Sequence, residues 1–408
     1  DFVEEFVGYD YLSTDVKITR YRKIKSAKDG NFYQLVFNLT PFYPEGGGQV
    51  GDKGYLQSFN GDVFYIIDTK KENNVILHYT KNLPSNLSEV FKAVVDSKQR
   101  SRTSSNHTAT HLLHQALRSI LGDHVEQKGS MVHSGVFRFD FSHFSKLKTE
   151  EIIEIEQFVN SRIMEHITLE ENRNEPYKEA IKKGAIGLFG EKYGDVVRTI
   201  KFGQSYELCG GTHVKNTHDI WHFKIISENS IASGIRRIEA ITGDAVKDHF
   251  EKRNDMIEQL ENKFNNPQDI IKTIDKIKEE NNNLKKELLE LSKINLKNLE
   301  QEINKSLIEK NRILFIAKEV DLDSKSIKDL TFLIGKKKDN LFLVFASNKG
   351  GKPIISCYIS KELLDKKDIN AIDVIRVLSK HIGGSGGGQN FFATSGGENP
   401  NGIKKALA

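Results

Sequence analysis

The chain has 408 residues, a net charge of +4 and 38% hydrophobic residues, which is the composition of an ordinary soluble protein. At about 150 residues per domain, this length predicts two or three domains. No stretch approaches about 18 consecutive apolar residues, and the acidic N-terminal segment lacks a basic and apolar leader, so we predict neither a membrane span nor a signal peptide. We therefore expect a cytoplasmic protein, and the first residue, Asp1, indicates a piece of a longer chain.

The first 88 residues have a strand-like pattern. Runs rich in β-branched and aromatic residues are separated by short turn sequences, and they read DVKITRYRKI, NFYQLVFNL, VFYIIDTK and NVILHYT. Several short strands with tight turns at this spacing predict a small barrel or sandwich.

After Leu87 the period of the apolar residues changes. Residues 88–121 predict two helices, the second capped near Ser105 or Asn106 and ended by Gly122. Further strands and helices alternate as far as residue 243 and predict a mixed α+β unit. The expected strands are 128–133, 136–142, 167–172, 196–202, 221–227 and 236–242, and the expected helices are 149–165 and 177–183.

Residues 244–311 predict helices of a different kind. Asn266 and Pro267 stand where a helix cap and a first turn are expected. Apolar residues then step by four and three from Ile270 to Leu291, with Asn281 at a core position, which is typical of a short coiled coil. About three heptads are compatible with a hairpin within the chain and with a dimer seam.

Residues 312–408 predict a small α/β domain. This tail carries a net charge of +6, whereas the charges of residues 1–243 sum to zero. A polyanionic partner or a solvated lysine-rich surface would explain the excess positive charge of the tail. Its loop GGSGGGQ follows a helix and precedes a strand, which is the reverse of a phosphate-binding strand, loop and helix. Close approach to RNA phosphates and a packing role both remain open for these glycines.

Two short motifs predict a metal site. HTATH places His107 and His111 on one face of a helix, and CGGTH gives Cys209 and His213 the same spacing on a turn. Thiolate and imidazole are the ligands that zinc prefers. Thr108 stands where a zinc peptidase of the HExxH type has its glutamate, so the chemistry differs from peptide hydrolysis.

The number of ligands leaves the role of the metal open. Four protein ligands are typical of structural zinc, whereas catalytic zinc keeps one position for water. His114 follows closely on the same predicted helix and is a further candidate for that face. The other cysteine, Cys357, lies in the alternating run PIISCYIS and is predicted to be a small core residue, so no disulfide framework is expected.

With HTATH, CGGTH, PFYPEGGGQVGD, GIRRIEAITG and GGSGGGQNFFATSGG, the whole chain resembles the C-terminal part of bacterial alanyl-tRNA synthetases. The resemblance implies an α+β multidomain protein without the aminoacylation core. Its four parts would be a β-barrel over 1–88, an α+β editing domain over 89–243, a helical or coiled-coil segment over 244–311 and a DHHA1-type tRNA-binding domain over 312–408.

The resemblance also implies an activity, the hydrolysis of tRNA(Ala) that has been mischarged with serine or glycine. A pocket for alanine rejects one added hydroxyl or one missing methyl by only about 1–3 kcal/mol, so a second hydrolytic site is useful. That second site can spare correct Ala-tRNA by offering a hydrogen bond that serine satisfies and alanine leaves unpaired.

Carried over residue by residue, the resemblance implies zinc held by the two histidines of HTATH and by the cysteine and histidine of CGGTH. Gln127 matches a polar editing residue of the family, and Arg236 matches a basic one that would hold the phosphate of the terminal adenosine. For Thr40 we hypothesise a role in reading the serine hydroxyl.

Two alternatives stay open at this point. One is the related editing domain of threonyl-tRNA synthetases, which shares the HxxxH and CxxxH pairs. The other is a non-catalytic arm with structural zinc, which binds tRNA and forms a homodimer through residues 244–408.

Overall fold

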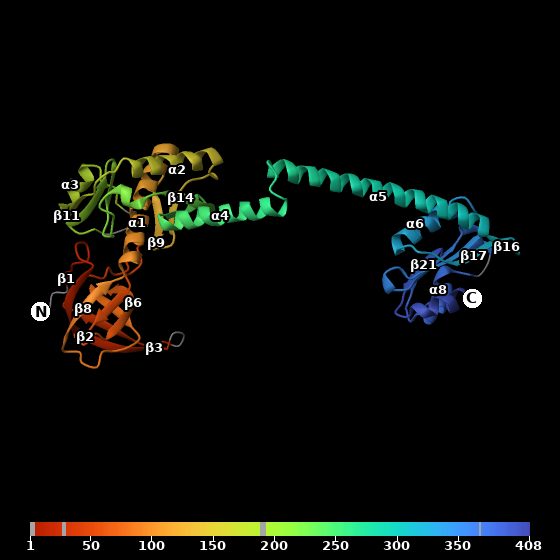
Figure 1. The fold of residues 1–408 in the computed structure, drawn as a ribbon, viewed down its shortest axis with the longest axis horizontal. Coiled ribbons are helices and arrows are strands. Elements are labelled where there is room, and N and C mark those ends of the chain that lie inside the picture. Colours follow the sequence, from red (N-terminus) through yellow and green to blue (C-terminus); the bar gives the residue numbers. More distant parts are fainter. Residues whose placement is uncertain (1–4, 27–29, 188–192, 367–368) are drawn as a thin grey trace. The chain divides into compact units, whose positions relative to one another are not determined.

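A computed structural model describes residues 5–26, 30–187, 193–366 and 369–408 (Figure 1). The chain divides into two compact units, Asp1–Gln259 and Leu260–Ala408. Within the described residues, no helix combines the length and the apolar character needed to cross a bilayer.

The N-terminal strands form a closed six-stranded barrel, so the barrel and not the sandwich is confirmed. Its interior is mostly apolar, with Leu35, Leu56 and Phe91 fully buried, and it also encloses His78. A short parallel pair, β1 (Glu5–Phe6) and β4 (Leu39–Thr40), lies outside the barrel sheet. The strands follow the order β2 (Ser13–Ser26), β3 (Gly30–Phe37), β7 (Val75–Thr80), β6 (Val63–Glu72), β5 (Gly54–Gln57) and β8 (Val90–Val95).

The prediction of two helices over residues 88–121 is wrong. Residues 90–95 form strand β8, because Phe91, Ala93 and Val95 alternate into the barrel core, a period-2 pattern that a short window does not separate from a helix. A single helix, α1 (Ser97–Leu121), follows, and its N-cap is Asp96, whose side chain accepts a hydrogen bond from the Gln99 amide. The predicted end at Gly122 is confirmed.

In the rest of this unit, two sheets and a further helix pack around helix α1. A four-stranded antiparallel sheet packs against α1 and α2 (Thr149–Met164), and its phenylalanines are fully buried: Phe137, Phe139, Phe141 and Phe223. The strand order is β14 (Phe223–Ala232), β15 (Ile235–Thr242), β10 (Phe137–Ser142) and β9 (Gln127–Val132). A separate three-stranded sheet holds β11 (Glu170–Pro176), β12 (Val196–Phe202) and β13 (Ser205–Leu208), with α3 (Tyr177–Lys182) and a 3-10 turn, η1 (Thr217–Ile220), nearby in sequence.

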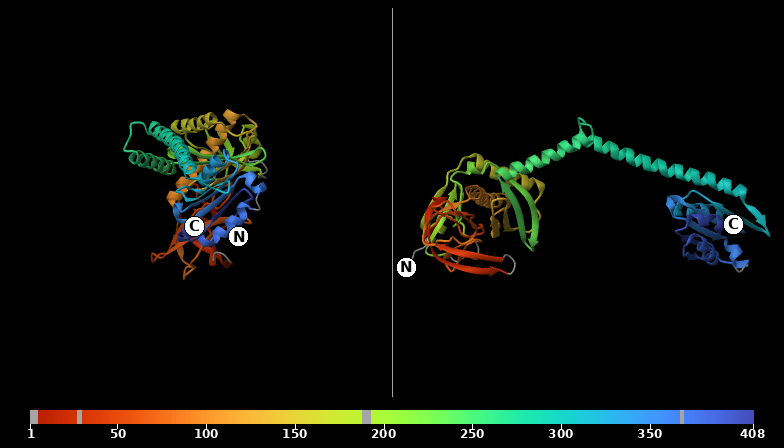
Figure 2. Two further views of the ribbon diagram at one scale, coloured as in Figure 1. Left: turned by 90° about the vertical axis from the view of Figure 1, so that its right-hand side faces the viewer. Right: turned by 60° about the horizontal axis from the view of Figure 1, so that its bottom comes forward.

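Two helices follow, α4 (Asp244–Lys263) and α5 (Ile270–Ser306). The cap predicted at Asn266 and Pro267 is wrong, because the Asp269 side chain accepts from the Lys272 amide and caps α5, while Asn266 lies in a turn with a positive φ of 51°. Figure 2 shows α5 as one continuous helix. Its predicted apolar seam is largely exposed in this chain, with Leu284 58% and Leu288 65% accessible.

The tail is an α/β domain, as predicted, built on one six-stranded sheet. Alternate residues of β18 (Leu341–Ser347) face opposite layers. Leu343 packs with α5 and α6 (Ser324–Gly335), while Val344 packs with α8 (Ala371–Leu378) and α9 (Ile403–Leu407). The strand order is β16 (Ile308–Lys310), β17 (Ile313–Glu319), β18 (Leu341–Ser347), β19 (Ile354–Ile359), β21 (Phe392–Gly396) and β20 (Gly387–Gln389). The helices are α6 (Ser324–Gly335), α7 (Lys361–Lys366), α8 (Ala371–Leu378) and α9 (Ile403–Leu407).

The glycine-rich segment of the tail serves packing. A Cβ added at Gly384 would lie 2.0 Å from the carbonyl oxygen of Gly396, and one at Gly386 would lie 2.2 Å from Ile375. The last three residues of the predicted loop form the edge strand β20, which pairs with β21. Cys357 is fully buried in β19, as predicted, and burial raises the pKa of its thiol to about 12.

One buried ion pair joins the barrel to helix α1. The Arg100 guanidinium on α1 is paired with Asp52 and also donates to the carbonyl oxygens of Gly8 at 2.6 Å and Pro41 at 2.9 Å. Both charged side chains are only 6% exposed. Arg100 therefore satisfies acceptors from two barrel segments at once.

We predict that Arg100→Leu lowers the free energy of unfolding of the first unit by about 3–5 kcal/mol, because the Asp52 carboxylate would remain buried without its partner. Thermal melting of the full chain measures the change. The matched control is Arg102→Leu on the same helix, whose 40% exposed side chain pairs with Asp244, and we expect a loss of about 1 kcal/mol or less there. Equal effects of the two substitutions would contradict the assignment.

Candidate metal centre and adjoining cavity

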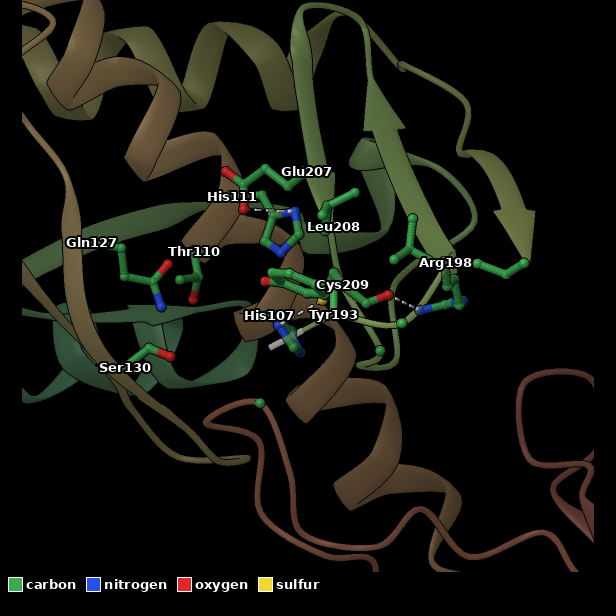
Figure 3. Close-up of a pocket in the computed structure, with 15 residues that line it drawn as sticks. His107, Thr110, His111, Gln127, Ser130, Tyr193, Arg198, Glu207, Leu208 and Cys209 are labelled. Atoms are coloured by element: carbon green, nitrogen blue, oxygen red, sulfur yellow. Dashed lines mark hydrogen bonds and ion pairs between the residues drawn. The ribbon is translucent and has the colours of Figure 1, made fainter. Parts of the chain in front are cut away.

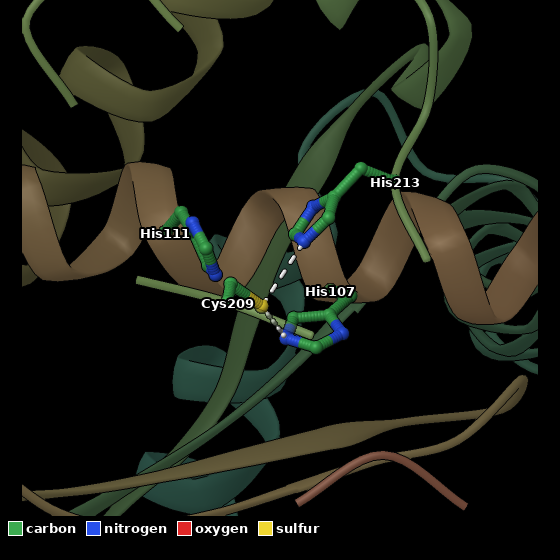
Figure 4. A group of neighbouring side chains, drawn as sticks. All are labelled: His107, His111, Cys209 and His213. Atoms are coloured by element: carbon green, nitrogen blue, oxygen red, sulfur yellow. Dashed lines mark hydrogen bonds between the residues drawn. The ribbon is translucent and has the colours of Figure 1, made fainter. Parts of the chain in front are cut away.

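Four side chains from two distant segments meet beside helix α1. His107 and His111 lie one turn apart on α1, and Cys209 and His213 lie in the turn that follows β13 (Figure 4). One ligand atom from each of the four lies within 4.8 Å of the others. The convergence that the two motifs predict is therefore present.

Two distances between ligand atoms match those around a tetrahedral ion. The Cys209 Sγ lies 3.4 Å from the His107 Nε2 and 3.3 Å from the His213 Nε2. Zinc bonds of about 2.0 Å to nitrogen and about 2.3 Å to sulfur place tetrahedral ligand atoms about 3.5 Å apart. The donor set and these two distances are compatible with zinc.

The protonation state of the imidazoles is also suitable. Burial, followed by the repulsion of the neighbouring imidazoles, holds the pKa of His107 and of His213 well below the usual range. Burial likewise lowers the pKa of His111, although Glu207 opposes the shift. Neutral imidazole is the form that binds a metal.

Two imidazoles of the cluster have a hydrogen-bond partner on the outer nitrogen, whereas the third only faces a carboxylate. The Nδ1 of His107 lies 2.7 Å from Gln49 Oε1, and that of His213 lies 3.1 Å from Thr108 Oγ1. The Nδ1 of His111 faces the Glu207 carboxylate at 3.5 Å. In this arrangement the Nε2 atoms of His107 and His213 face the Cys209 thiol.

His114 lies outside this group of four. Its Nδ1 is 2.9 Å from Glu207, which therefore stands between His111 and His114. Burial opposes ionisation of this carboxyl, but the two imidazoles hold the pKa of Glu207 below its usual value. The sequence predicts that His114 lines the ligand face of the helix. In the structure it contacts Glu207, which in turn faces the cluster residue His111.

A cavity of about 260 Å³ opens beside the cluster (Figure 3). Three of its polar side chains come from α1 and β9, namely Thr110, Gln127 and Ser130, and its wall also includes the cluster residues His107, His111 and Cys209. Gln127, predicted from the sequence as a site residue, is thus brought next to the cluster.

The structure does not bring Thr40 or Arg236 into the lining of this cavity. Thr40 is 3% exposed in the barrel unit, and its Oγ1 lies 2.7 Å from the His78 Nε2. Because the His78 Nδ1 faces the Leu35 carbonyl oxygen at 3.1 Å, the Thr40 hydroxyl donates to Nε2. Arg236 on β15 is paired through its Nε with Glu228 on β14.

Sequence reasoning missed several residues that build the site. Arg198 on β12 donates to the carbonyl oxygens of Cys209 at 2.8 Å and Gly211 at 2.6 Å, which fixes the CGGTH turn. Gln49 and Glu207 contact two of the cluster imidazoles. An alternating strand pattern surrounds Arg198, and a glycine-rich turn surrounds Gln49, but neither pattern indicates which distant segment the side chain meets.

Comparisons with known proteins agree with this architecture. A model described as the threonyl and alanyl tRNA synthetase second additional domain matches residues 197–239, which include the CGGTH turn. A model for class II (A) tRNA synthetases matches residues 1–100, and a model of the DHHA1 domain matches residues 312–408. The chain thus carries an editing-type domain of the aminoacyl-tRNA synthetases together with a DHHA1 domain.

Comparison with individual proteins shows which aminoacyl-tRNA synthetases the chain is similar to in sequence. The chain is 57% identical over 404 residues to the alanine–tRNA ligase of Christiangramia forsetii, across 99% of this chain and 46% of that protein. It is 52% identical over 413 residues to the alanine–tRNA ligase of Flavobacterium psychrophilum, across 99% of this chain and 47% of that protein. It belongs to the alanyl-tRNA synthetase family, and it corresponds to the C-terminal part of these enzymes.

The chain spans about half the length of the curated relatives it matches. Among solved structures, the C-Ala domain of Aquifex aeolicus alanyl-tRNA synthetase matches 25% of this chain and 90% of its own length, with 25% identity and a TM-score of 0.23.

Proposed function

We propose that the first unit hydrolyses the ester bond of tRNA(Ala) mischarged with serine or glycine. The observation that carries the proposal is the cavity whose wall includes three residues of the His and Cys cluster, within a chain that carries the editing-type domain. An aminoacylation pocket for alanine separates these amino acids by only about 1–3 kcal/mol, which is why a hydrolytic second site is needed.

The cluster is proposed to hold zinc. Four protein ligands close the coordination sphere, which is typical of an ion that organises a site, and the thiolate lowers its remaining positive charge. When bound, the ion would join α1 to the CGGTH turn and polarise the wall of the cavity.

Hydrolysis itself is assigned to positioned polar groups. An aminoacyl ester is already reactive, so a held water and donors for the developing oxyanion suffice without a carboxylate base. The Gln127 carboxamide can donate and accept at once. The Thr110 hydroxyl donates to the Asn106 carbonyl oxygen at 2.8 Å, so its lone pairs can accept from a water in the cavity.

Arg236 keeps its proposed role of binding the terminal phosphate by a bidentate contact, and this contact would have to form outside the cavity wall, with the Arg236 Nε already paired with Glu228. For Thr40 the proposed role is not carried forward, because its hydroxyl donates to His78 instead of facing the cavity. Burial lowers the pKa of His78 to about 3, so this imidazole stays neutral and keeps its acceptor nitrogen.

The tail is proposed to bind the body of tRNA(Ala). Its net charge of +6 and its match to the DHHA1 domain support this assignment. The same match, together with the barrel, favours tRNA(Ala) over the tRNA(Thr) that a threonyl-type editing domain would take. A partner of this kind supports the proposed cytoplasmic location.

A homodimer through residues 244–408 is the second part of the proposal. The apolar residues of α5 at coiled-coil spacing, Ile277, Leu284, Leu288 and Leu291, are 46–65% exposed in the single chain. Exposed apolar surface of this kind is typical of an interface with a partner.

We predict that the purified full chain binds a single zinc ion and that Cys209→Ala loses it, because the only thiolate of the cluster is removed. Chelator competition measures the affinity. Cys357→Ala is the matched control, since it removes the buried thiol of the tail sheet and should leave zinc bound. Equal affinities of the two variants would contradict the ligand assignment.

The full chain should release serine and glycine from Ser-tRNA(Ala) and Gly-tRNA(Ala) and should leave Ala-tRNA(Ala) largely intact. Gln127→Ala should slow this deacylation by about 100-fold if the carboxamide stabilises the transition state. Gln204→Ala, an exposed glutamine outside the cavity wall, is the control and should keep the rate. Faster hydrolysis of Ser-tRNA(Thr) would favour the threonyl-type alternative, and no hydrolysis would leave only a binding arm.

Sedimentation analysis tests the dimer. Leu284→Glu with Leu288→Glu should shift the full chain toward the monomer, because two charges would enter the apolar seam. Lys286→Glu, placed on the opposite face by the heptad spacing, should leave the association unchanged. A wild-type chain that remains monomeric at every concentration would refute the dimer.

A further inference from the structure

One glutamine of the barrel unit reaches into the metal cluster. Gln49 is fully buried and follows the turn Gly46–Gly48, which lies between β4 and the barrel strand β5. This turn is fixed to strand β9 of the four-stranded sheet, because the Val50 amide donates to the Val132 carbonyl oxygen at 3.0 Å and the Val132 amide donates to that of Gly48 at 2.7 Å.

Gly48 in this turn is required for the close approach of the turn to strand β9. Gly48 has a φ of +79°, and an added Cβ would lie 2.2 Å from the Ser130 Oγ on β9. A side chain at this position would therefore push the turn away from β9. Gln49 would then be withdrawn from the cluster.

The orientation of the Gln49 carboxamide follows from its partners. Its Oε1 accepts a hydrogen bond from the Thr212 backbone amide at 2.9 Å, and its Nε2 donates to the Thr212 Oγ1 at 3.0 Å. Because a backbone N–H only donates, the oxygen and nitrogen of the carboxamide cannot be exchanged.

This orientation fixes the tautomer of a cluster imidazole. The same Gln49 Oε1 lies 2.7 Å from the Nδ1 of His107, so Nδ1 carries the proton and donates it to the oxygen. The Nε2 lone pair then points toward Cys209 Sγ, 3.4 Å away. A metal-binding imidazole needs this free lone pair.

The middle of the CGGTH motif is shaped for this contact. An added Cβ at Gly211 would lie 2.0 Å from the His107 Cε1 and 2.9 Å from the Gln49 Oε1. The absence of a side chain at Gly211 therefore lets the imidazole and the carboxamide meet against the backbone of the turn.

We propose that Gln49 is a positioning residue that holds His107 in the tautomer and orientation needed to bind the metal, and that ties the CGGTH turn to the same point. The inference rests on the proposed zinc site, and it makes the barrel a part of that site. Outer partners of metal-binding histidines typically contribute about 10- to 100-fold to metal affinity.

The test uses the full chain and zinc alone. Gln49→Met keeps the length of the side chain but removes both hydrogen bonds, so zinc affinity by chelator competition should fall about 10- to 100-fold. Gln49→Glu keeps an acceptor for His107 and for the Thr212 amide, and it should bind zinc within a few-fold of the wild type. Gln34→Met is the matched control, since Gln34 is a buried barrel glutamine bonded to Arg22.

A second readout is the visible spectrum of the cobalt-substituted chain, whose thiolate and ligand-field bands should change in Gln49→Met and return in Gln49→Glu. Far-ultraviolet circular dichroism checks the fold, and if Gln49→Met does not fold, Gln49→Asn replaces it, because the shorter amide cannot reach both partners. Wild-type zinc affinity and cobalt spectrum in the variant used would overturn the inference while leaving the zinc site intact. A wild-type chain that binds no zinc would overturn both.

Discussion

The turn that carries Cys209 and His213 has to be held against helix α1 by side chains, because residues 209–213 belong to no helix or strand. Buried backbone groups need partners, and here other segments supply them. Arg198 donates to two carbonyl oxygens of the turn, and the Tyr9 hydroxyl donates to the Gly210 carbonyl oxygen at 2.6 Å. The Arg198 guanidinium also stacks 3.9 Å above the Tyr9 ring. The geometry of the metal cluster depends on these contacts.

The barrel, helix α1 and the sheets packed around it consequently act as one structural unit. A single loop of the barrel provides Gln49, which contacts the imidazole of His107, and Asp52, which binds Arg100 near the start of the same helix. The loop thus fixes α1 at two points about two turns apart. The barrel contributes few residues to the cavity wall. Its role in the site is to hold helix α1 in place.

Much of the local structure could be predicted from patterns of apolar residues. The barrel strands, the sheet phenylalanines and the buried Cys357 follow from alternation, since each strand has one face in a core. The errors lie where a short segment fits two periods. Residues 90–95 were predicted to be helical, but their alternate side chains fill the barrel, and the cap of α1 therefore moves to Asp96. Burial of alternate side chains in the closed barrel makes this segment a strand. The short local pattern alone does not distinguish a strand from a helix.

Local sequence patterns were enough to predict the four clustered side chains, because helical spacing places His107 and His111 on one face and the cysteine of the front half lies near a histidine. The sequence by itself also indicated Gln127 as a candidate that the fold then placed in the cavity wall. Only the tertiary structure decided that Gln49 and Glu207 face the outer nitrogens of the cluster and that Thr40 bonds His78 instead. Ligand spacing is a local property of the chain, whereas the partner of a buried polar side chain is set by the packing of segments far apart in sequence.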